Sequence, residues 1–324
     1  MSKPAKKTIK TWSTPVQEEE RISVPCTLCG GTLFVSYYKD AGSNPLFCPE
    51  NTPEGEASEL LFFNYVRCTR CGLVQINPQP APEAVARRYD TNHGREYLDY
   101  EKANEKVFLE LQELALRDAG FYDLEKDFFS LKGKEGTFPE SENRAPLAMD
   151  IGCATGALLL SLKSRGWAVQ GVEISGPEAA YCRDRGLKVS TLPLGKNNFT
   201  ARNFNVVFAS HVIEHLNNPF GFVLEVKRIL KPQGRFYVTT PNIAGFQARF
   251  FGSRWRSAIF DHLYLFSAKT LRALLEKAGF TVELIRTWGG LAEGTAPVPV
   301  KRIFDTLAKP LGFGDVMIAS AIPR

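Results

Sequence analysis

The chain has 324 residues, of which 44% are hydrophobic, so it can form a core of roughly 200 residues and a smaller module beside it. Its formal net charge is +5, but Lys3, Lys6, Lys7 and Lys10 supply four of these charges, and the rest of the chain is close to neutral. This balance argues against a broad nucleic-acid-binding face, because sequence-independent affinity for phosphates needs clustered Lys and Arg.

The first predicted element is a metal-binding module at residues 22–82, which follows a flexible tail. No apolar run approaches the ~20 residues of a membrane-spanning helix, so we expect a cytoplasmic protein with reduced thiols. Four of the seven cysteines form two CxxC pairs, in VPCTLCGG and VRCTRCGL: Cys26, Cys29, Cys68 and Cys71. Four thiolates can complete a tetrahedral Zn²⁺ site, so we predict a structural zinc ion without an open coordination position.

The flexible tail comprises residues 1–21. Cys48 lies between the two CxxC pairs, in a stretch at residues 40–59 that is rich in Pro, Gly and Asn. It could replace one zinc ligand, but a spare thiol in a loop is the simpler interpretation because four ligands already fill the site. A dithiol redox pair is the remaining alternative for the CxxC sequences.

A helical connector is predicted at residues 83–131. It begins in APEAVARRYD, after the short strand GLVQINPQP, and helical spacing resumes near Tyr97. The apolar residues of the second helix recur mostly at steps of three and four residues, and we predict that they face the core: Val107, Phe108, Leu111, Leu114 and Leu116. Residues 132–146 are charged and lack apolar periodicity, which is typical of a linker.

Residues 145–324 alternate strand and helix patterns, which predicts an α/β domain with a parallel sheet covered by helices. The predicted strands include LAMDI (147–151), AVQGVE (168–173), NVVFAS (205–210), RFYVTTPN (235–242) and TVELIRT (281–287). Helices are expected to begin near Thr155, Ser175, Asn218 and Ser267, each after a capping or turn residue.

The sequence LAMDIGCATG places a glycine turn at the end of the first of these strands. Gly152 allows a sharp turn, Gly156 lets the helix pack on the strand, and Asp150 and Glu173 end adjacent strands. An acid at the end of the second strand can accept hydrogen bonds from ribose hydroxyls. Because the turn lacks GxGxxG spacing and no phosphate cradle is near, a nucleoside ligand without a pyrophosphate is favoured.

The sequence resembles class I S-adenosylmethionine-dependent methyltransferases, and more narrowly the bacterial type with an N-terminal zinc-binding module. The resemblance rests on the CxxC pairs, DIGCATG, GVEIS, FNVVFASHVIEHLNNP, LKPQGRFYVTTPN and HLYLFSAKTLRALLEKAGF. It implies a Rossmann-like core of seven strands with a reversed last strand, supplied by VMIASAIPR. A small zinc-ribbon-like module would precede this core.

The resemblance also implies the cofactor, S-adenosyl-L-methionine, and its contacts. Asp150, Gly152, Cys153 and Gly156 would surround the methionine part, Glu173 would hold the ribose hydroxyls, and Ser210 and His211 would belong to the same cofactor site.

Two positions depart from the family pattern. Ala154 replaces a glycine, which we expect to be tolerated if its φ stays negative. The third strand, LKVSTLPLG, offers no Asp for the adenine amino group, so Thr191, Leu192 or a backbone group would take that contact.

Methyl transfer from a sulfonium requires in-line alignment, and an alcohol acceptor must also lose a proton. Three histidines are candidate catalytic bases. His211 and His215 occur in SHVIEHL and would share one face if that segment is helical; His262 occurs in FDHLYLFS, where Asp261 could orient it. For each of them a packing role is the alternative, and Glu214 is expected to be structural or solvent-facing.

The pattern His-x-x-Glu-His in SHVIEHL also fits the inverzincin motif, but we reject that interpretation because the pattern follows a sheet strand instead of lying in a long helix. An aromatic-rich loop could cover the acceptor pocket, although some of its side chains should be core: Phe246, Phe250, Phe251, Trp255 and Phe260. The expected acceptor is a small or glycan-related molecule, methylated on a hydroxyl. The alternatives are an RNA methyltransferase that grips nucleic acid with its zinc module, and a non-catalytic zinc-containing assembly protein.

Overall fold

The computed structural model describes residues 20–41, 63–88, 93–130, 145–289 and 312–324. Cys48 lies outside these ranges. So do the predicted tail and the predicted linker, except for residues 20–21 and 145–146.

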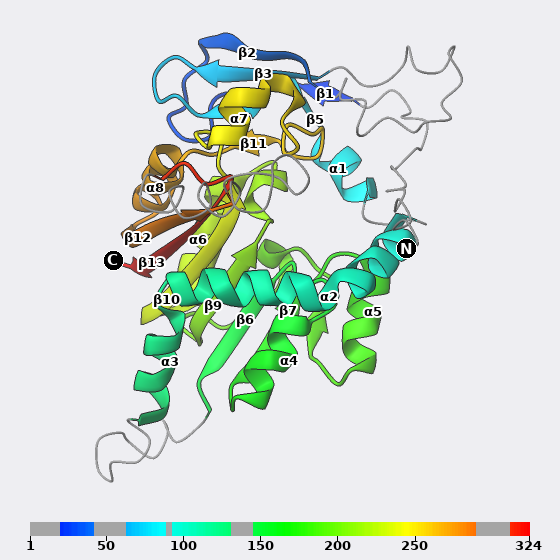
Figure 1. Ribbon diagram of the computed structural model, residues 1–324, viewed down its shortest axis with the longest axis vertical. Helices are drawn as coiled ribbons and strands as arrows, with labels where there is room; N and C mark the ends of the chain where they lie inside the picture. Colours follow the sequence, from blue (N-terminus) through cyan, green and yellow to red (C-terminus); the bar gives the residue numbers. More distant parts are fainter. Residues whose placement is uncertain (1–19, 42–62, 89–92, 131–144, 290–311) are drawn as a thin grey trace, which may run out of the picture.

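A seven-stranded sheet forms the centre of the molecule, in the order β12-β13-β10-β9-β6-β7-β8 (Figure 1). Its strands are β6 (Leu147–Ile151), β7 (Ala168–Val172), β8 (Val189–Ser190), β9 (Phe204–Ser210), β10 (Leu230–Pro241), β12 (Phe280–Trp288) and β13 (Val316–Pro323). Neighbouring strands are parallel along the part of the sheet that runs β10-β9-β6-β7-β8. In contrast, β13 is antiparallel to both of its neighbours, β10 and β12. The predicted seven-stranded sheet with a reversed last strand is therefore confirmed.

Helices connect the strands as the alternating pattern predicts. They are α4 (Ala157–Ser164), α5 (Gly176–Asp184), α6 (Pro219–Ile229) and α8 (Ala268–Lys277). The Asn218 side chain accepts a hydrogen bond from the backbone N–H of Gly221 at 2.9 Å and so caps the start of α6. Ser267 and Thr270 form a reciprocal capping box at the start of α8.

The connector contains α1 (Pro82–Arg88), α2 (His93–Asp118) and α3 (Phe121–Ser130), and α2 crosses one face of the sheet (Figure 1). The prediction that its apolar stripe faces the core is wrong for Val107, Leu111 and Leu114, which are 54%, 48% and 38% exposed. The prediction is confirmed for Leu116, which is buried together with Ala115 at the end of α2 and Ala119 just after it. Small alanines let the helix approach the sheet closely, so the neighbouring stripe of larger side chains is left outside.

The N-terminal module contributes two small sheets. The first pairs β1 (Arg21–Ile22) with β5 (Gln79–Pro80), and the second has the order β11-β4-β3-β2. The strands of the second sheet are β2 (Phe34–Ala41), β3 (Phe63–Cys68), β4 (Val74–Ile76) and β11 (Tyr264–Leu265). Because β11 comes from the C-terminal half of the chain, the module is joined to the larger domain by a shared sheet.

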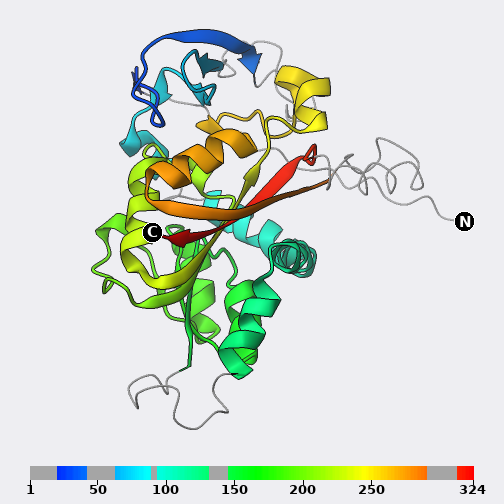
Figure 2. The same cartoon turned by 90° about the vertical axis from the view of Figure 1, so that its left-hand side faces the viewer.

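The module lies above the carboxyl ends of the parallel strands, next to β11 and α7 (Phe246–Phe251) (Figure 2). One continuous cluster of buried apolar side chains runs from the module into the main sheet. Within the described ranges, no helix combines the length and the apolar composition that crossing a bilayer would require.

Candidate functional site

The glycine turn after β6 requires glycine at two positions. Gly152 has φ +70° and Gly156 has φ +79°. An added Cβ would lie 2.5 Å from a methyl of Val212 at the first position and 2.4 Å from a methyl of Leu187 at the second. Ala154 between them has φ +46°, so the condition for tolerating alanine at this position is not met and this alanine is strained.

Glu173, which follows β7, holds this strained turn in place. Its Oε2 accepts a hydrogen bond from the backbone N–H of Ala154 and its Oε1 accepts one from the N–H of Ser175, both at 2.9 Å. Each carboxylate oxygen keeps a further lone pair. Glu173 can therefore fix the turn and still accept bonds from a ligand.

Buried acids gather around the turn. The Oδ1 atom of Asp150 is buried and has no hydrogen-bond partner among the described residues. Burial and the neighbouring Glu173 raise the pKa of Asp150 well above its usual value. Burial also raises the pKa of Glu173 to about 7, against the two backbone hydrogen bonds that lower it, and the carboxyls of Glu178 and Glu101 add to the rise.

Glu101 comes from α2, and nothing in its sequence context indicated a place in the site. Burial raises the pKa of Glu101 as well. The neighbouring Glu105 forms an ion pair with Arg185, at 2.6 Å, and this guanidinium also donates to the carbonyl of Thr155. This ion pair fixes the first half of α2 beside the glycine turn.

His211 follows β9 directly and has an unusual backbone, with φ +53°. Its Nδ1 atom lies 3.1 Å from Oε1 of Glu214, while 48% of its side chain is exposed. Glu214 itself is fully buried, so the solvent-facing alternative for this acid is wrong, and its Oε2 accepts a hydrogen bond from Thr240 at 3.0 Å. Burial opposes ionisation of Glu214, but the hydrogen bond and charge of His211, with the charges of His215 and His262, hold its pKa at about 2.

His215 and His262 face each other, with ring centroids 4.7 Å apart. His262 is oriented by the backbone carbonyl of Ser257, 2.8 Å from its Nδ1. Burial lowers the pKa of His262 to about 3, so this imidazole is neutral at pH 7 and is not a base that titrates near neutrality. The helical part of this segment is a short 3-10 turn at Ile213–His215, which does not include His211. His211 and His215 therefore do not share a helix face.

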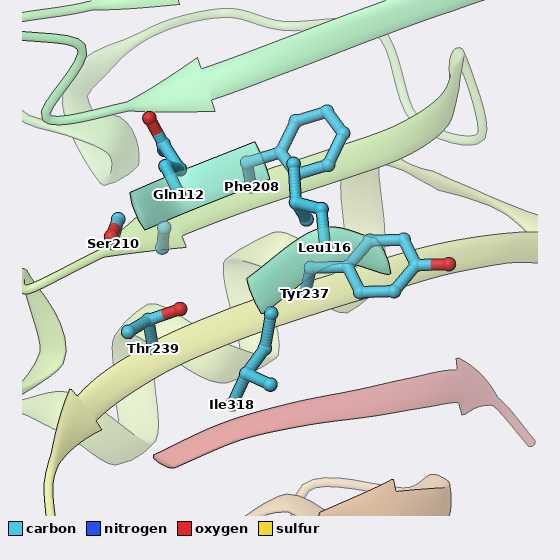
Figure 3. A pocket seen from close by; sticks show the side chains of 8 residues that line it. Gln112, Leu116, Phe208, Ser210, Tyr237, Thr239 and Ile318 are labelled. Carbon is cyan, nitrogen blue, oxygen red and sulfur yellow. The ribbon is translucent and has the colours of Figure 1, made fainter. Parts of the chain in front are cut away.

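A small cavity lies between α2 and the strands β9, β10 and β13. Figure 3 shows Gln112 and Leu116 on α2 opposite Ser210 and Thr239, which lie near the ends of β9 and β10. Its volume of about 10 Å³ suits a single water molecule and not a nucleoside. Ser210 lines this small cavity, and its predicted cofactor contact stays a prediction.

Exposed groups surround the ends of β7 and β8. Ile174 and Leu192 are exposed apolar side chains, and Thr191 beside Leu192 is exposed too. In the aromatic loop, Trp255 is buried and its Nε1 donates to Asp315 at 2.5 Å, whereas Phe250 is 71% exposed. At least one of the loop aromatics is therefore core, as expected.

The four predicted cysteine ligands converge. The Sγ atoms of Cys26 and Cys71 are 3.4 Å apart, those of Cys29 and Cys68 are 3.5 Å apart, and all four lie within 4.8 Å of one another. Bonds of about 2.3 Å to a tetrahedral ion place sulfurs about 3.8 Å apart, so the arrangement fits zinc. Gly30 and Gly72, which follow the two pairs, have φ +69° and +79°, a backbone conformation that glycine adopts without strain.

The module also contacts the histidine region directly. The hydroxyl of buried Tyr65, on β3, donates to the carbonyls of Ile259 and His262 at 2.9 and 2.8 Å. Lys277 on α8 donates to the carbonyl of Leu28, between two of the cysteines, at 2.8 Å. The backbone around His262 is thus fixed by the cysteine-bearing module.

These features define a Rossmann-like methyltransferase fold: a mostly parallel seven-stranded sheet, a reversed β13 and a glycine turn after β6. Residues 132–285 match the family model described as a methyltransferase domain. A ubiquinone biosynthesis O-methyltransferase from Caulobacter vibrioides is 31% identical over 101 residues, which cover 29% of this chain and 40% of that protein. A tRNA U34 carboxymethyltransferase from Methylococcus capsulatus is 34% identical over 95 residues, covering 28% of this chain and 29% of that protein.

The chain thus spans less than half the length of the curated relatives that it matches. Among solved structures, an S-adenosylmethionine-dependent methyltransferase from Thermotoga maritima, described as a possible histamine N-methyltransferase, is 21% identical. The match covers 68% of this chain and 98% of that one, with a TM-score of 0.44.

Proposed function

We propose that this protein transfers a methyl group from S-adenosylmethionine to a hydroxyl of a small or glycan-related molecule. The observation that carries the proposal is the set of acids around the glycine turn, of which three are buried and the last is half-buried: Asp150, Glu173, Glu178 and Glu101. Burial raises the pKa of these carboxyls, and repulsion by neighbouring acids adds to the rise at Asp150, Glu173 and Glu101. A cationic ligand would stabilise their charged forms. S-adenosylmethionine is positively charged at its sulfonium and amino groups, whereas a dinucleotide would bring an anionic pyrophosphate.

Each part of the cofactor has a matching group. Gly152, Cys153 and Gly156 form the turn that approaches the methionine part, and the unpartnered Oδ1 of Asp150 is available to its amino group. The carboxylate of Glu173 would accept the ribose hydroxyls. The exposed apolar side chains of Ile174 and Leu192 suit the faces of a purine.

Once bound, the cofactor supplies an electrophilic methyl group on a sulfonium. His211 is the group best placed to take the acceptor's proton, because its imidazole is half exposed at the end of β9 while Glu214 fixes its Nδ1. Because Nδ1 of His211 contacts Glu214, the Nε2 atom of the same ring is directed away from Glu214. His215 and His262 are more enclosed, which favours a supporting role for both.

The zinc ion is part of the proposal. Cys26, Cys29, Cys68 and Cys71 would hold it in a closed tetrahedral site, where it folds the module and activates no water. Through Tyr65 the folded module would keep His262 and its loop in position.

The relatives differ in their acceptors. One is named for ubiquinone biosynthesis and another for a tRNA base, and each matches less than a third of this chain. A hydroxylated small molecule is favoured here because the chain outside its N-terminal lysines is close to neutral.

The experiment is transfer of radiolabelled methyl groups from S-adenosylmethionine to three sets of acceptors: hydroxylated aromatics, sugar derivatives and transfer RNA. Product from either small-molecule set, lost in Asp150→Asn, supports the proposal. Transfer to RNA alone would replace it with the RNA alternative, and the absence of cofactor binding would replace it with the assembly protein.

A further inference from the structure

Glu214, His215 and His262 form a second cluster of metal-ligating groups, separate from the four cysteines. One ligand atom from each lies within 4.8 Å of those of the other two. Two imidazoles and one carboxylate are a donor set that proteins use for Zn²⁺, Fe²⁺ and similar ions when positions stay open for a substrate. Bonds of about 2.1 Å put neighbouring ligand atoms roughly 3 to 3.5 Å apart, so binding draws the three side chains together.

One of the two imidazoles, that of His262, already has the hydrogen bond that supports a metal-bound histidine. The Nδ1 atom of His262 lies 2.8 Å from the carbonyl oxygen of Ser257, so Nδ1 carries the proton and Nε2 keeps its lone pair. A second ring nitrogen that donates to a carbonyl is the usual support of a metal-bound histidine. The Nδ1 atom of His215 is buried and has no hydrogen-bond partner among the described residues.

The carboxylate is fixed and its charge is buried. Thr240 donates to Oε2 of Glu214, and His211 contacts Oε1. A divalent cation beside this fully buried carboxylate would compensate its charge more strongly than an imidazole does. His215 is only partly buried, so one side of the cluster remains accessible.

We propose that Glu214, His215 and His262 bind one divalent transition-metal ion that keeps at least one coordination position open. In the proposed reaction, the ion would bind the acceptor hydroxyl and lower its pKa. The O–H bond breaks with transfer of the proton to His211, the oxygen attacks the methyl carbon, and the C–S bond breaks with its electron pair left on sulfur. This catalytic role rests on the proposed function, whereas metal binding by the cluster does not.

The test uses the full chain, loaded with zinc and free of cofactor, and titrates it with Mn²⁺. Thiolates hold zinc, whereas Mn²⁺ prefers oxygen and nitrogen ligands, so the four-cysteine site does not compete. The paramagnetic resonance signal of free Mn²⁺ reports binding. We expect one Mn²⁺ per wild-type chain and at least tenfold weaker binding in His215→Gln and in His262→Gln.

Glu125→Gln is the matched control, because it removes a buried carboxyl on α3, outside both the cluster and the acids around the glycine turn, and should bind Mn²⁺ like the wild type. The thermal unfolding midpoint of each variant shows whether it is folded, and His215→Gln, at the more exposed position, keeps the test valid if His262→Gln unfolds. The proposal would be overturned if the wild-type chain holds one zinc and leaves the signal of free Mn²⁺ unchanged. It would also be overturned if His215→Gln and His262→Gln bind Mn²⁺ as tightly as the wild type. Cofactor binding is measured on the same samples, so a chain that binds Mn²⁺ but not S-adenosylmethionine would refute the proposed function alone.

Discussion

Replacing Glu173 with Gln should weaken S-adenosylmethionine binding and remove its pH dependence. A hydrogen bond to a charged group contributes about 1.5 to 3 kcal/mol, against about 0.5 to 1.5 kcal/mol for a neutral one. Two ribose hydroxyls would therefore lose roughly 2 to 3 kcal/mol in Glu173→Gln. At about 1.4 kcal/mol per factor of ten, this corresponds to a roughly 30- to 150-fold higher Kd at pH 8.

The pH dependence follows from the raised pKa of Glu173, which is about 7. The ribose needs the carboxylate, which is the minor form below that pKa and the major form above it. Affinity should therefore rise with pH, and the ionised fraction changes about tenfold between pH 6 and pH 8. The wild-type Kd should fall by that factor across this range, whereas the Kd of Glu173→Gln should stay nearly constant.

Calorimetric titrations at pH 6, 7 and 8 measure both effects. Glu178→Gln is the control, because removing this neighbouring carboxyl should keep the pH dependence and move its midpoint to lower pH. The reasoning is refuted if wild-type affinity does not change with pH, or if Glu173→Gln keeps the wild-type slope.

Three further substitutions test other parts of the account. Cys29→Ser should release zinc, measured by elemental analysis, and unfold the module, measured by circular dichroism, while the Kd for S-adenosylmethionine changes less than threefold. A variant that is folded but free of metal would contradict the zinc site. Ala154→Gly should stabilise the protein by about 1 kcal/mol in denaturant unfolding, because glycine adopts positive φ without strain; destabilisation would contradict this. His211→Asn should lower turnover at saturating S-adenosylmethionine by about 10²- to 10⁴-fold, and a loss of less than tenfold would return His211 to a structural role.

The sheet and the glycine turn could be predicted because their causes are local. Buried strands show as apolar runs, and Gly152 and Gly156 stand where the backbone needs positive φ. The strain at Ala154 could not be predicted, because alanine rarely adopts that conformation alone. It is held there by Glu173, nineteen residues away in the chain.

Other parts of the site depend on packing between distant segments. Glu101 reaches the acidic group only because α2 crosses the sheet, and spacing along that helix did not show which stripe would be buried. The pairing of β11 with β4 joins Tyr264 to Gln75, far apart in sequence. The two CxxC sequences were sufficient to predict the cysteine cluster, since each turn brings its own two sulfurs together.

The approach of His262 to His215 had no counterpart in the sequence. His262 precedes β11, and its position is set by the carbonyl of Ser257 and by Tyr65 from the N-terminal module. The short 3-10 turn at Ile213–His215 then separates His215 from His211. Because these contacts involve three distant segments, motif spacing could nominate the histidines but could not arrange them.

The most direct test of the central claim, that the acidic turn binds a cationic nucleoside cofactor, is a calorimetric titration of the wild-type chain with S-adenosylmethionine at pH 8, with NAD titrated in parallel. The account predicts saturable binding of one S-adenosylmethionine per chain and no heat from NAD, whose pyrophosphate the buried carboxyls would repel. Saturable binding of NAD, or no binding of S-adenosylmethionine at millimolar concentration, would contradict it.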